Sequence, residues 1–312
     1  MPDTVQTVNM PSETKPELPP ATSDGQPTAP ASIDGVAIPS EIPVVIYGGE
    51  HNQRALADVF RAVRNFRVAW LLAWQDIVQR YRRSTLGPFW LTISRAILIA
   101  AIAAIFGPIF GRQQAEFLPF LASGMILWSF ISTSLGDGCT AFTSSESLIK
   151  QLPLPLFTHI LRSSIRNSII LAHDLLILPV VFWWYSVAPG WDILLAIPGF
   201  AILSLALISA SLMLGILCTR YRDMPQMVSS VLRVSFYVTP VMWLPDLLGT
   251  GPRSLILTFN PFYHLLEVVR TPFLNGAPPG LSWLVGISMA LASSVAALAL
   301  FRKKQKRLVF WL

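Results

Sequence analysis

Three arginines, Arg80, Arg82 and Arg83, lie close together in the sequence beside Tyr81. A guanidinium group donates two parallel hydrogen bonds to phosphate oxygens, so such a cluster is a candidate phosphate-binding site. Arginines that flank an apolar segment also set its orientation in a membrane and hold anionic lipid headgroups. On the residues alone the topological role is the more common one, and both interpretations stay open.

The acidic side chains offer less chemistry. His173 and Asp174 are adjacent inside an apolar stretch, where such a pair belongs either to a proton relay or, more commonly, to a helix-packing hydrogen bond. Asp137 and Glu267 lie in comparable surroundings, without an evident partner in the sequence. These acids are too scattered for the carboxylate-rich site of a membrane-embedded glycosyltransferase.

The chain also lacks the sequence elements of nucleotide and metal chemistry. None of its five lysines follows a glycine, so it contains no G-x-x-x-x-G-K-[ST] phosphate loop. ATP-driven work would therefore need an ATPase on another polypeptide. Cys139 and Cys218 have no metal or redox spacing and are expected to be small buried or interfacial thiols. We expect no catalytic residue, no metal site and no cofactor on this chain.

The composition is that of a protein with the bilayer as its solvent. Of 312 residues, 53% are hydrophobic and only 13% are charged, against roughly 25% charged in an ordinary soluble domain. The net charge is +6, and the basic residues lie at the ends of apolar runs rather than in one patch. That distribution favours membrane topology over nucleic-acid binding.

Two regions precede the apolar runs. Residues 1–50 hold nine prolines and a single aromatic residue, Tyr47, which predicts a disordered tail. Residues 51–87 carry apolar side chains every three or four positions with arginines between them. This pattern predicts amphipathic helices in the membrane interface, with packing against soluble protein as the alternative. Their apolar positions are Leu56, Phe60, Val63, Phe66, Trp70, Trp74, Ile77, Val78 and Tyr81.

Six apolar segments within residues 88–301 approach the roughly 20 residues needed to cross about 30 Å of hydrocarbon. The fifth is the shortest and is interrupted by Arg233 and Pro240. The segments are Pro88–Phe110, Phe117–Leu135, Ile165–Tyr185, Ile193–Leu217, Met227–Trp243 and Leu281–Phe301.

The stretch between the fifth and sixth segments holds two shorter apolar pieces, Leu255–Leu266 and Val268–Leu274. Asn260-Pro261 and Thr271-Pro272 interrupt them. Short apolar pieces broken by proline predict re-entrant helices on the periplasmic face. An ordinary external loop with an interfacial helix is the alternative.

Lysines and arginines are distributed asymmetrically about the six segments. Eighteen fall on one side, including the basic tail 302–312, and three, Arg112, Arg253 and Arg270, fall on the other. The positive-inside rule assigns the first side, and with it both termini, to the cytoplasm. Arg95 lies well inside the first span, where an arginine costs about 2.5–3.5 kcal/mol at the helix centre. We expect it to reach back to the cytoplasmic headgroups rather than to face the interior.

Four stretches resemble one protein family in the same order. The most specific is Trp74–Trp90, WQDIVQRYRRSTLGPFW. The others are Arg222-Asp223 with Tyr237–Val241, Asn260-Pro261-Phe262 with Glu267 and Arg270, and the C-terminal Phe310-Trp311-Leu312. From about residue 55 onward the chain is similar to the permease subunits of ABC-2 type polysaccharide exporters, which carry capsule, O-antigen or teichoic acid.

The resemblance implies an all-α membrane protein in which six-span subunits form a homodimer in the bacterial inner membrane. It implies a separate cytoplasmic ABC ATPase that holds ATP and magnesium, and export of a glycan attached to undecaprenyl pyrophosphate. Under this resemblance, Arg80, Arg82 and Arg83 are the candidates for receiving the pyrophosphate of the lipid carrier.

The polar loop Thr143–Gln151 has the character of a docking surface for such an ATPase, and in the family this loop is a coupling helix. Ser144 or Ser145 could cap a short helix there, ahead of Pro153. A plain solvated loop is the alternative. The candidate coupling residues are Ser144, Glu146, Leu148 and Lys150.

Aromatic side chains are dense near the outer ends of the spans, where an interfacial belt explains most of them. A glycan conduit would also need flat aromatic faces, and the candidates are Phe106, Phe110, Trp128, Trp183 and Tyr237. The competing interpretation of the chain is an ion- or proton-coupled secondary transporter. It predicts inverted repeats and centrally broken spans, and no repeat is visible in the sequence.

Overall fold

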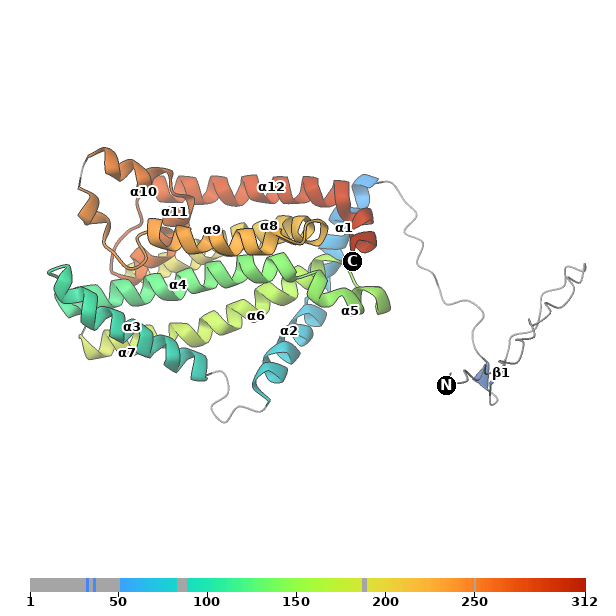
Figure 1. Ribbon diagram of the computed structural model, residues 1–312, viewed down its shortest axis with the longest axis horizontal. Helices are drawn as coiled ribbons and strands as arrows, with labels where there is room; N and C mark the ends of the chain where they lie inside the picture. The colour runs from blue at the N-terminus through green and yellow to red at the C-terminus, as the bar shows by residue number, and fades with distance from the viewer. Residues whose placement is uncertain (1–31, 34–35, 38–50, 83–88, 187–189, 250) are drawn as a thin grey trace, which may run out of the picture. The chain divides into compact units, whose positions relative to one another are not determined.

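The computed structural model describes residues 32–33, 36–37, 51–82, 89–186, 190–249 and 251–312 (Figure 1). The chain separates into two units, Met1–Tyr47 and Gly48–Leu312. In the first unit, strand β1 (Ser32–Ile33) pairs antiparallel with β2 (Val36–Ala37). The rest of the predicted tail 1–50 lies outside the described residues.

In the second unit, five helical segments are long and apolar enough to cross a membrane. Each overlaps one of the predicted spans, so the prediction of a multi-pass, all-helical membrane domain is confirmed at this level. The segments are α3 (Phe89–Ile109), α4 (Gln114–Thr140), α6 (Phe157–Leu175) with α7 (Ile177–Trp184), α8 (Ala196–Arg220) with a 3₁₀ turn at Trp191–Leu195 before it, and α12 (Gly280–Trp311).

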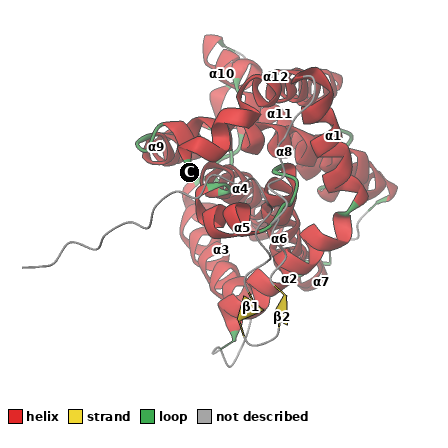
Figure 2. Cartoon of the chain, turned by 90° about the vertical axis from the view of Figure 1, so that its right-hand side faces the viewer, coloured by secondary structure: helices red, strands yellow, loops and turns green. Residues whose placement is uncertain are grey.

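Helix α4 lies at the centre of the bundle, where α6, α8 and α11 (Pro261–Phe273) surround it (Figure 2). Small residues allow α4 and α8 to approach closely. A Cβ atom on Gly138 would lie only 2.6 Å from the Cβ of Ser211, and the Ser211 hydroxyl donates to the Ser134 carbonyl at 3.0 Å. Close backbone approach through small residues is how helices associate in lipid, where burial of apolar surface gives little driving force.

The predicted fifth span corresponds to α9 (Met224–Val238), which has 15 residues. At about 1.5 Å per residue it reaches about 22 Å, which is less than the ~30 Å of hydrocarbon. It packs beside α4 with Leu232 buried, while Met227, Val231 and Val234 remain exposed (Figure 1). Helix length therefore does not confirm a sixth crossing.

Two helices, α1 (His51–Arg64) and α2 (Phe66–Tyr81), occupy the predicted amphipathic region. The bulky apolar side chains face mostly outward: Phe60 is 67% exposed and Trp74 is 50% exposed. Small side chains cover the opposite face. Large apolar groups that point away from the protein favour contact with lipid over packing on a soluble core. The wholly buried small residues are Ala55, Ala62, Ala69 and Ala73.

The stretch before α12 folds as α10 (Leu255–Phe259) and α11. The break at Asn260-Pro261 falls where it was predicted, because Asn260 caps α11 by accepting from the backbone N–H groups of Phe262 and Tyr263 at 3.0 and 3.2 Å. The predicted break at Thr271-Pro272 is wrong. Pro272 lies in the last turn of α11, which continues to Phe273 and is buried against α8 and α12.

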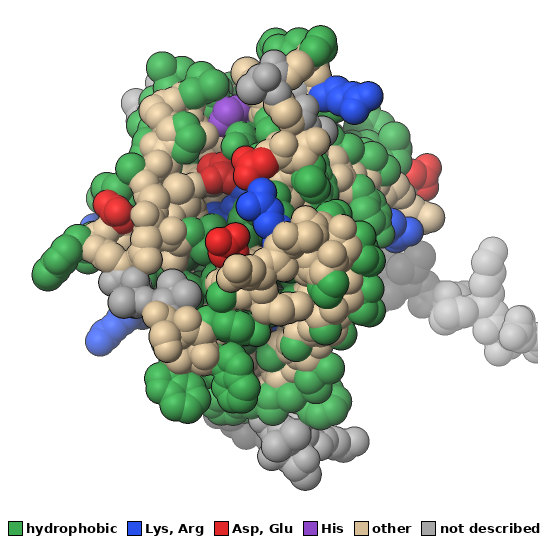
Figure 3. Space-filling model, turned by 90° about the vertical axis from the view of Figure 1, so that its left-hand side faces the viewer, with side chains coloured by type: hydrophobic (Ala, Val, Ile, Leu, Met, Phe, Trp, Pro, Cys, Tyr) green, Lys and Arg blue, Asp and Glu red, His purple; other side chains and the backbone are tan. Residues whose placement is uncertain are grey.

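The two ends of the bundle differ in character. At one end, α12 continues through the predicted tail 302–312 to Trp311, near α1 and the short helix α5 (Glu146–Gln151) (Figure 1). At the other end, acidic and basic side chains gather within an apolar surface (Figure 3). The connection after α3 lies at that end, and its Arg112 pairs with Asp246 at 3.3 Å.

Candidate functional site

The candidate phosphate site at the end of α2 is open. Arg80 and Arg82 are both exposed, and Arg83 lies outside the described residues. Within the part of the chain that the structure describes, no ion pair involves Arg80 or Arg82. No carboxylate of the described residues therefore neutralises their guanidinium groups.

One turn earlier, Asp76 is the centre of a network that the sequence did not suggest. Its carboxylate accepts from Arg162 Nε at 2.8 Å and from Arg166 Nη1 at 2.9 Å. Arg166 Nη2 also donates to Asp137 at 2.7 Å, so Asp137 has a partner after all. The network joins α2 to α6 and α4. Burial by itself raises the pKa of Asp76, but the two guanidinium groups outweigh it and hold that pKa below its usual value.

A second acid ties α1 to the bundle. Asp58 accepts from the backbone N–H groups of Leu156 and Phe157, at 3.2 and 3.0 Å, and so satisfies donors at the start of α6. Burial raises the pKa of the Asp58 carboxyl, and these hydrogen bonds only partly offset it. Asp58 stands among arginines in the sequence, where it resembles an ordinary surface acid.

The predicted coupling loop forms a 3₁₀ turn at Thr143–Ser145 followed directly by α5. Ser144 and Lys150 are exposed, Glu146 and Leu148 are half-buried, and Lys150 Nζ lies 2.6 Å from Glu146 Oε1. The expected side-chain cap is wrong: the helix begins after Ser145, whose hydroxyl makes no capping hydrogen bond. The loop is nevertheless helical and accessible.

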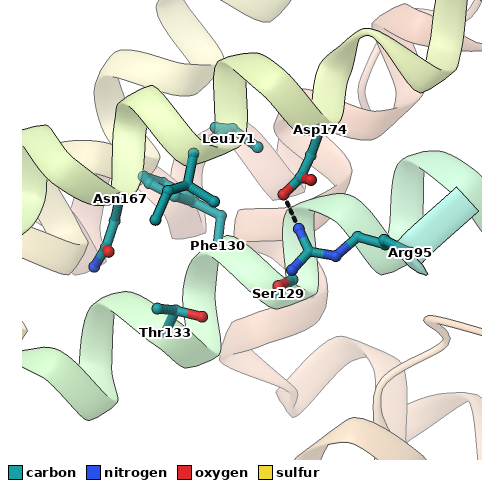
Figure 4. Close-up of a pocket in the computed structure, with 8 residues that line it drawn as sticks. Arg95, Ser129, Phe130, Thr133, Asn167, Leu171 and Asp174 are labelled. Atoms are coloured by element: carbon teal, nitrogen blue, oxygen red, sulfur yellow. Dashed lines mark ion pairs between the residues drawn. The ribbon is translucent and has the colours of Figure 1, made fainter. Parts of the chain in front are cut away.

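Arg95 does not reach back to the headgroups, which corrects the sequence-based expectation. It extends from α3 toward α6 and forms an ion pair with Asp174, which is almost fully buried (Figure 4). Thr92 Oγ1 also donates to Asp174, at 3.3 Å. An ion pair is the arrangement in which a charge is tolerated at membrane depth. His173 contacts the Ile169 carbonyl of its own helix at 2.8 Å, so it is Asp174 that links α6 to α3.

The candidate conduit aromatics lie in three different places. Trp128 and Tyr237 line one groove of about 330 Å³ between α4 and α9. Phe106 and Phe110 stack on each other with ring centroids 5.9 Å apart, within the contact of α3 and α4. Trp183 is 79% exposed at the end of α7. Only the first pair is brought together at one surface that also carries polar side chains, namely Ser132, Ser229 and Arg233.

The model of the ABC-2 type transporter family matches residues 67–274, more than half of the chain. The chain belongs to this family. It is 23% identical over 241 residues to the O-antigen export system permease protein RfbA of Myxococcus xanthus, covering 75% of this chain and 91% of that protein. It is 26% identical over 207 residues to an O-antigen export system permease protein RfbA of Klebsiella pneumoniae, covering 65% of this chain and 78% of that protein.

The ABC-2 match includes the Asp76 network, α5 and the α4–α9 groove, and it ends at α11. There Arg270, counted in the sequence on the outer side of the membrane, is buried. It pairs with Glu267, donates to the Pro240 carbonyl at 2.6 Å, and lies 4.1 Å from the centroid of the Phe120 ring. These contacts fix α11 to α4 and to the turn after α9, so Glu267 also has a partner.

Proposed function

We propose that this chain is the permease subunit of an ABC exporter that moves a polysaccharide on an undecaprenyl pyrophosphate carrier across the bacterial inner membrane. The observation that carries the proposal is the family match, together with two O-antigen export permeases that align over most of their length. Energy would come from ATP and magnesium on a separate ABC ATPase.

The docking surface for that ATPase would be α5, with α1 beside it. Helix α5 follows the central helix α4 after a single 3₁₀ turn, so a push on it would be passed to the centre of the bundle. Its Glu146–Lys150 pair is exposed, and Leu148 offers an apolar contact. Asp58 supports the participation of α1, because it links α1 to the start of α6 close to Pro155.

The lipid carrier would enter at the end of α2. Arg80 lies in the last turn of α2, and Arg82 and Arg83 come directly after it in the sequence. The large apolar side chains of α2 face outward, so the pyrophosphate could be bound at headgroup depth. The glycan would then pass along the α4–α9 groove. The ring of Trp128 is fixed against Phe236 and Phe262, with centroid distances of 5.9 and 5.5 Å, and Tyr237 is 65% exposed.

The finer architecture belongs to the same proposal. We take α9, extended by residues 239–243, as the sixth crossing, which returns the C-terminus to the side of the N-terminus. The distribution of lysines and arginines then places both termini in the cytoplasm. The groove is formed by residues of α4 and α9 and is open to the surroundings. In a homodimer, a second copy of the chain would enclose it.

Coexpression with a candidate ABC ATPase tests the proposal. We expect the two chains to copurify, the complex to hydrolyse ATP, and cells that lack this permease to lose surface polysaccharide. Absence of both copurification and ATP hydrolysis would refute the exporter. Glycan-independent ion flux in proteoliposomes would then favour the secondary transporter.

A charge-removal experiment tests the substrate site. Arg82→Gln with Arg83→Gln should leave membrane insertion and ATPase copurification intact but abolish export of the glycan. Lys303→Gln with Lys306→Gln, exposed on α12, removes the same charge away from the docking surface and the substrate site and is the matched control. Normal surface glycan in the Arg82 and Arg83 variant would remove these residues from the site.

A further inference from the structure

A cavity of about 380 Å³ lies between the last turns of α8 and α12, at the end of the bundle that carries α5. Three cationic side chains line it, Arg220 from α8 and Lys304 and Arg307 from α12. The two helices run parallel in a fixed register, because Ser209 Oγ and Ser294 Oγ meet at 2.8 Å. That register brings Arg220 opposite Lys304.

Arg220 and Arg307 are exposed and Lys304 is half-buried, and their partners differ from those of the paired cations of the bundle. Among the residues that the structure describes, no carboxylate pairs with Arg220, Lys304 or Arg307. Aromatic rings contact Arg220 and Lys304 instead. Arg220 lies 5.6 Å from the centroid of the Trp311 ring and 5.9 Å from that of Tyr221, and Lys304 lies 5.9 Å from the Trp311 centroid. Cation–π contacts orient the side chains without neutralising their charge.

The remaining wall of the cavity is apolar. Ile216 and Leu217 lie one turn before Arg220, and Leu300 lies one turn before Lys304. All three belong to segments apolar enough to cross the membrane. The cavity therefore has an apolar side toward the hydrocarbon and a cationic side where α8 ends and α12 leaves the bilayer. This matches a ligand with an acyl chain joined to a phosphate.

We propose that this cavity binds the headgroup of an anionic phospholipid, with the phosphate among Arg220, Lys304 and Arg307 and an acyl chain along Ile216 and Leu300. Guanidinium and ammonium groups at headgroup depth attract anionic lipid, and the arginine fork matches phosphate oxygens. The bound lipid would join α12 to α8 beyond the point at which their apolar contact ends.

Native mass spectrometry of the purified full chain, titrated with phosphatidylglycerol or phosphatidylcholine, tests the site. We expect saturable binding of phosphatidylglycerol and much weaker binding of phosphatidylcholine. Lys304→Gln with Arg307→Gln should weaken phosphatidylglycerol binding at least about tenfold, because two charge-assisted contacts are lost. Lys303→Gln with Lys306→Gln removes two exposed cations from the same helix and should leave binding unchanged. Arg220→Gln tests the site from α8 and should give a similar loss.

Several outcomes would overturn the lipid site. Equal weakening by the two α12 double variants would indicate general charge attraction. Displacement of the lipid by millimolar inorganic phosphate would indicate a site for a soluble anion. Loss of ATPase copurification in the Lys304 and Arg307 variant, with lipid binding retained, would assign the surface to a protein partner. The titration needs neither glycan nor ATPase, so its result is independent of the proposed export function.

Discussion

Arg162 and Arg166 on α6 pair with the carboxylates of Asp76 and Asp137. In the described part of the chain, no carboxylate pairs with Arg220, Lys304 or Arg307 at the ends of α8 and α12. The first group holds three helices of the same chain together. The charges of the second group are not neutralised within the described residues, and in our proposal they bind the phosphate of an anionic lipid. The presence or absence of a carboxylate partner therefore separates the two groups. A paired arginine holds helices together, and an arginine or lysine without such a partner is available to bind an anionic ligand.

Exposure follows the same division. Arg162 and Arg166 are 19% and 16% exposed, so their charges interact in surroundings with little water. In such surroundings a paired charge contributes little net stability, but a charge that loses its partner is strongly destabilising. Substitutions at the first group should therefore lower the free energy of unfolding, whereas substitutions at the second group should weaken ligand binding.

Asp76→Asn should have the largest effect on stability. It leaves Arg162 without a carboxylate and Arg166 with Asp137 alone, so we expect the free energy of unfolding to fall by about 3–5 kcal/mol. Thermal denaturation in detergent measures the change. Asp137→Asn, which removes only one contact, should cost less. An Asp76→Asn protein as stable as the wild type would show that the network does not hold α2 in place.

The Asp76 network also predicts a pH dependence. The pKa of Asp76 is lower in the folded chain than in the unfolded chain, so its contribution is fully present above the unfolded value of about 4. That contribution is lost as the pH falls through the lower folded pKa. The difference in denaturation temperature between wild type and Asp76→Asn should therefore shrink below about pH 4. A difference that stays constant down to pH 2 would contradict the electrostatic origin.

The Arg95–Asp174 pair should give the next largest effect. Asp174→Leu leaves Arg95 with no carboxylate, and we expect a loss of about 2–3 kcal/mol, since Arg95 is 21% exposed and can partly rehydrate. Arg95→Met combined with Asp174→Leu removes both charges and should recover most of that stability. Thermal denaturation of the wild type, of each single variant (Arg95→Met and Asp174→Leu) and of the double variant completes a double-mutant cycle and measures the coupling. A double variant no more stable than Asp174→Leu would argue against an ion pair.

Long apolar runs and proline positions were sufficient to predict α3, α4, α8 and the break at Asn260, because a helix that crosses the bilayer needs a continuous apolar run that is visible in the sequence. Ion pairs between helices were not predictable. Asp76 and Arg162 are far apart along the chain, and the helix rotation that joins them is set by packing of small residues such as Ala69 and Ala73. For the same reason Arg95 was assigned to the headgroups. The candidate arginines of the substrate site remain a prediction.

Asp58 should give a smaller effect. Asp58→Ala removes the acceptor for the N–H groups of Leu156 and Phe157 and should cost about 1–2 kcal/mol, as other lost helix caps do. Asp58→Asn keeps one acceptor oxygen and should cost less. The pKa of Asp58 is raised in the folded chain, so wild-type stability relative to Asp58→Asn should fall as the pH rises from about 4 through that raised value. The opposite trend in thermal denaturation would contradict the buried environment of Asp58.

The smallest stability effect is expected at the exposed pair on α5, where the contrast with the Asp76 network is sharpest. Glu146 and Lys150 are 45% and 50% exposed, and pairs four residues apart on a helix contribute about 0.3–0.5 kcal/mol. Glu146→Gln with Lys150→Gln should therefore leave thermal denaturation almost unchanged. If α5 is the docking helix, the same variant should uncouple ATP hydrolysis from export in proteoliposomes. Ser288→Ala, exposed on α12 and outside both α5 and the α4–α9 groove, is the control. Unchanged coupling would remove α5 from the docking surface, and a large loss of stability would show that the pair belongs with the structural cations.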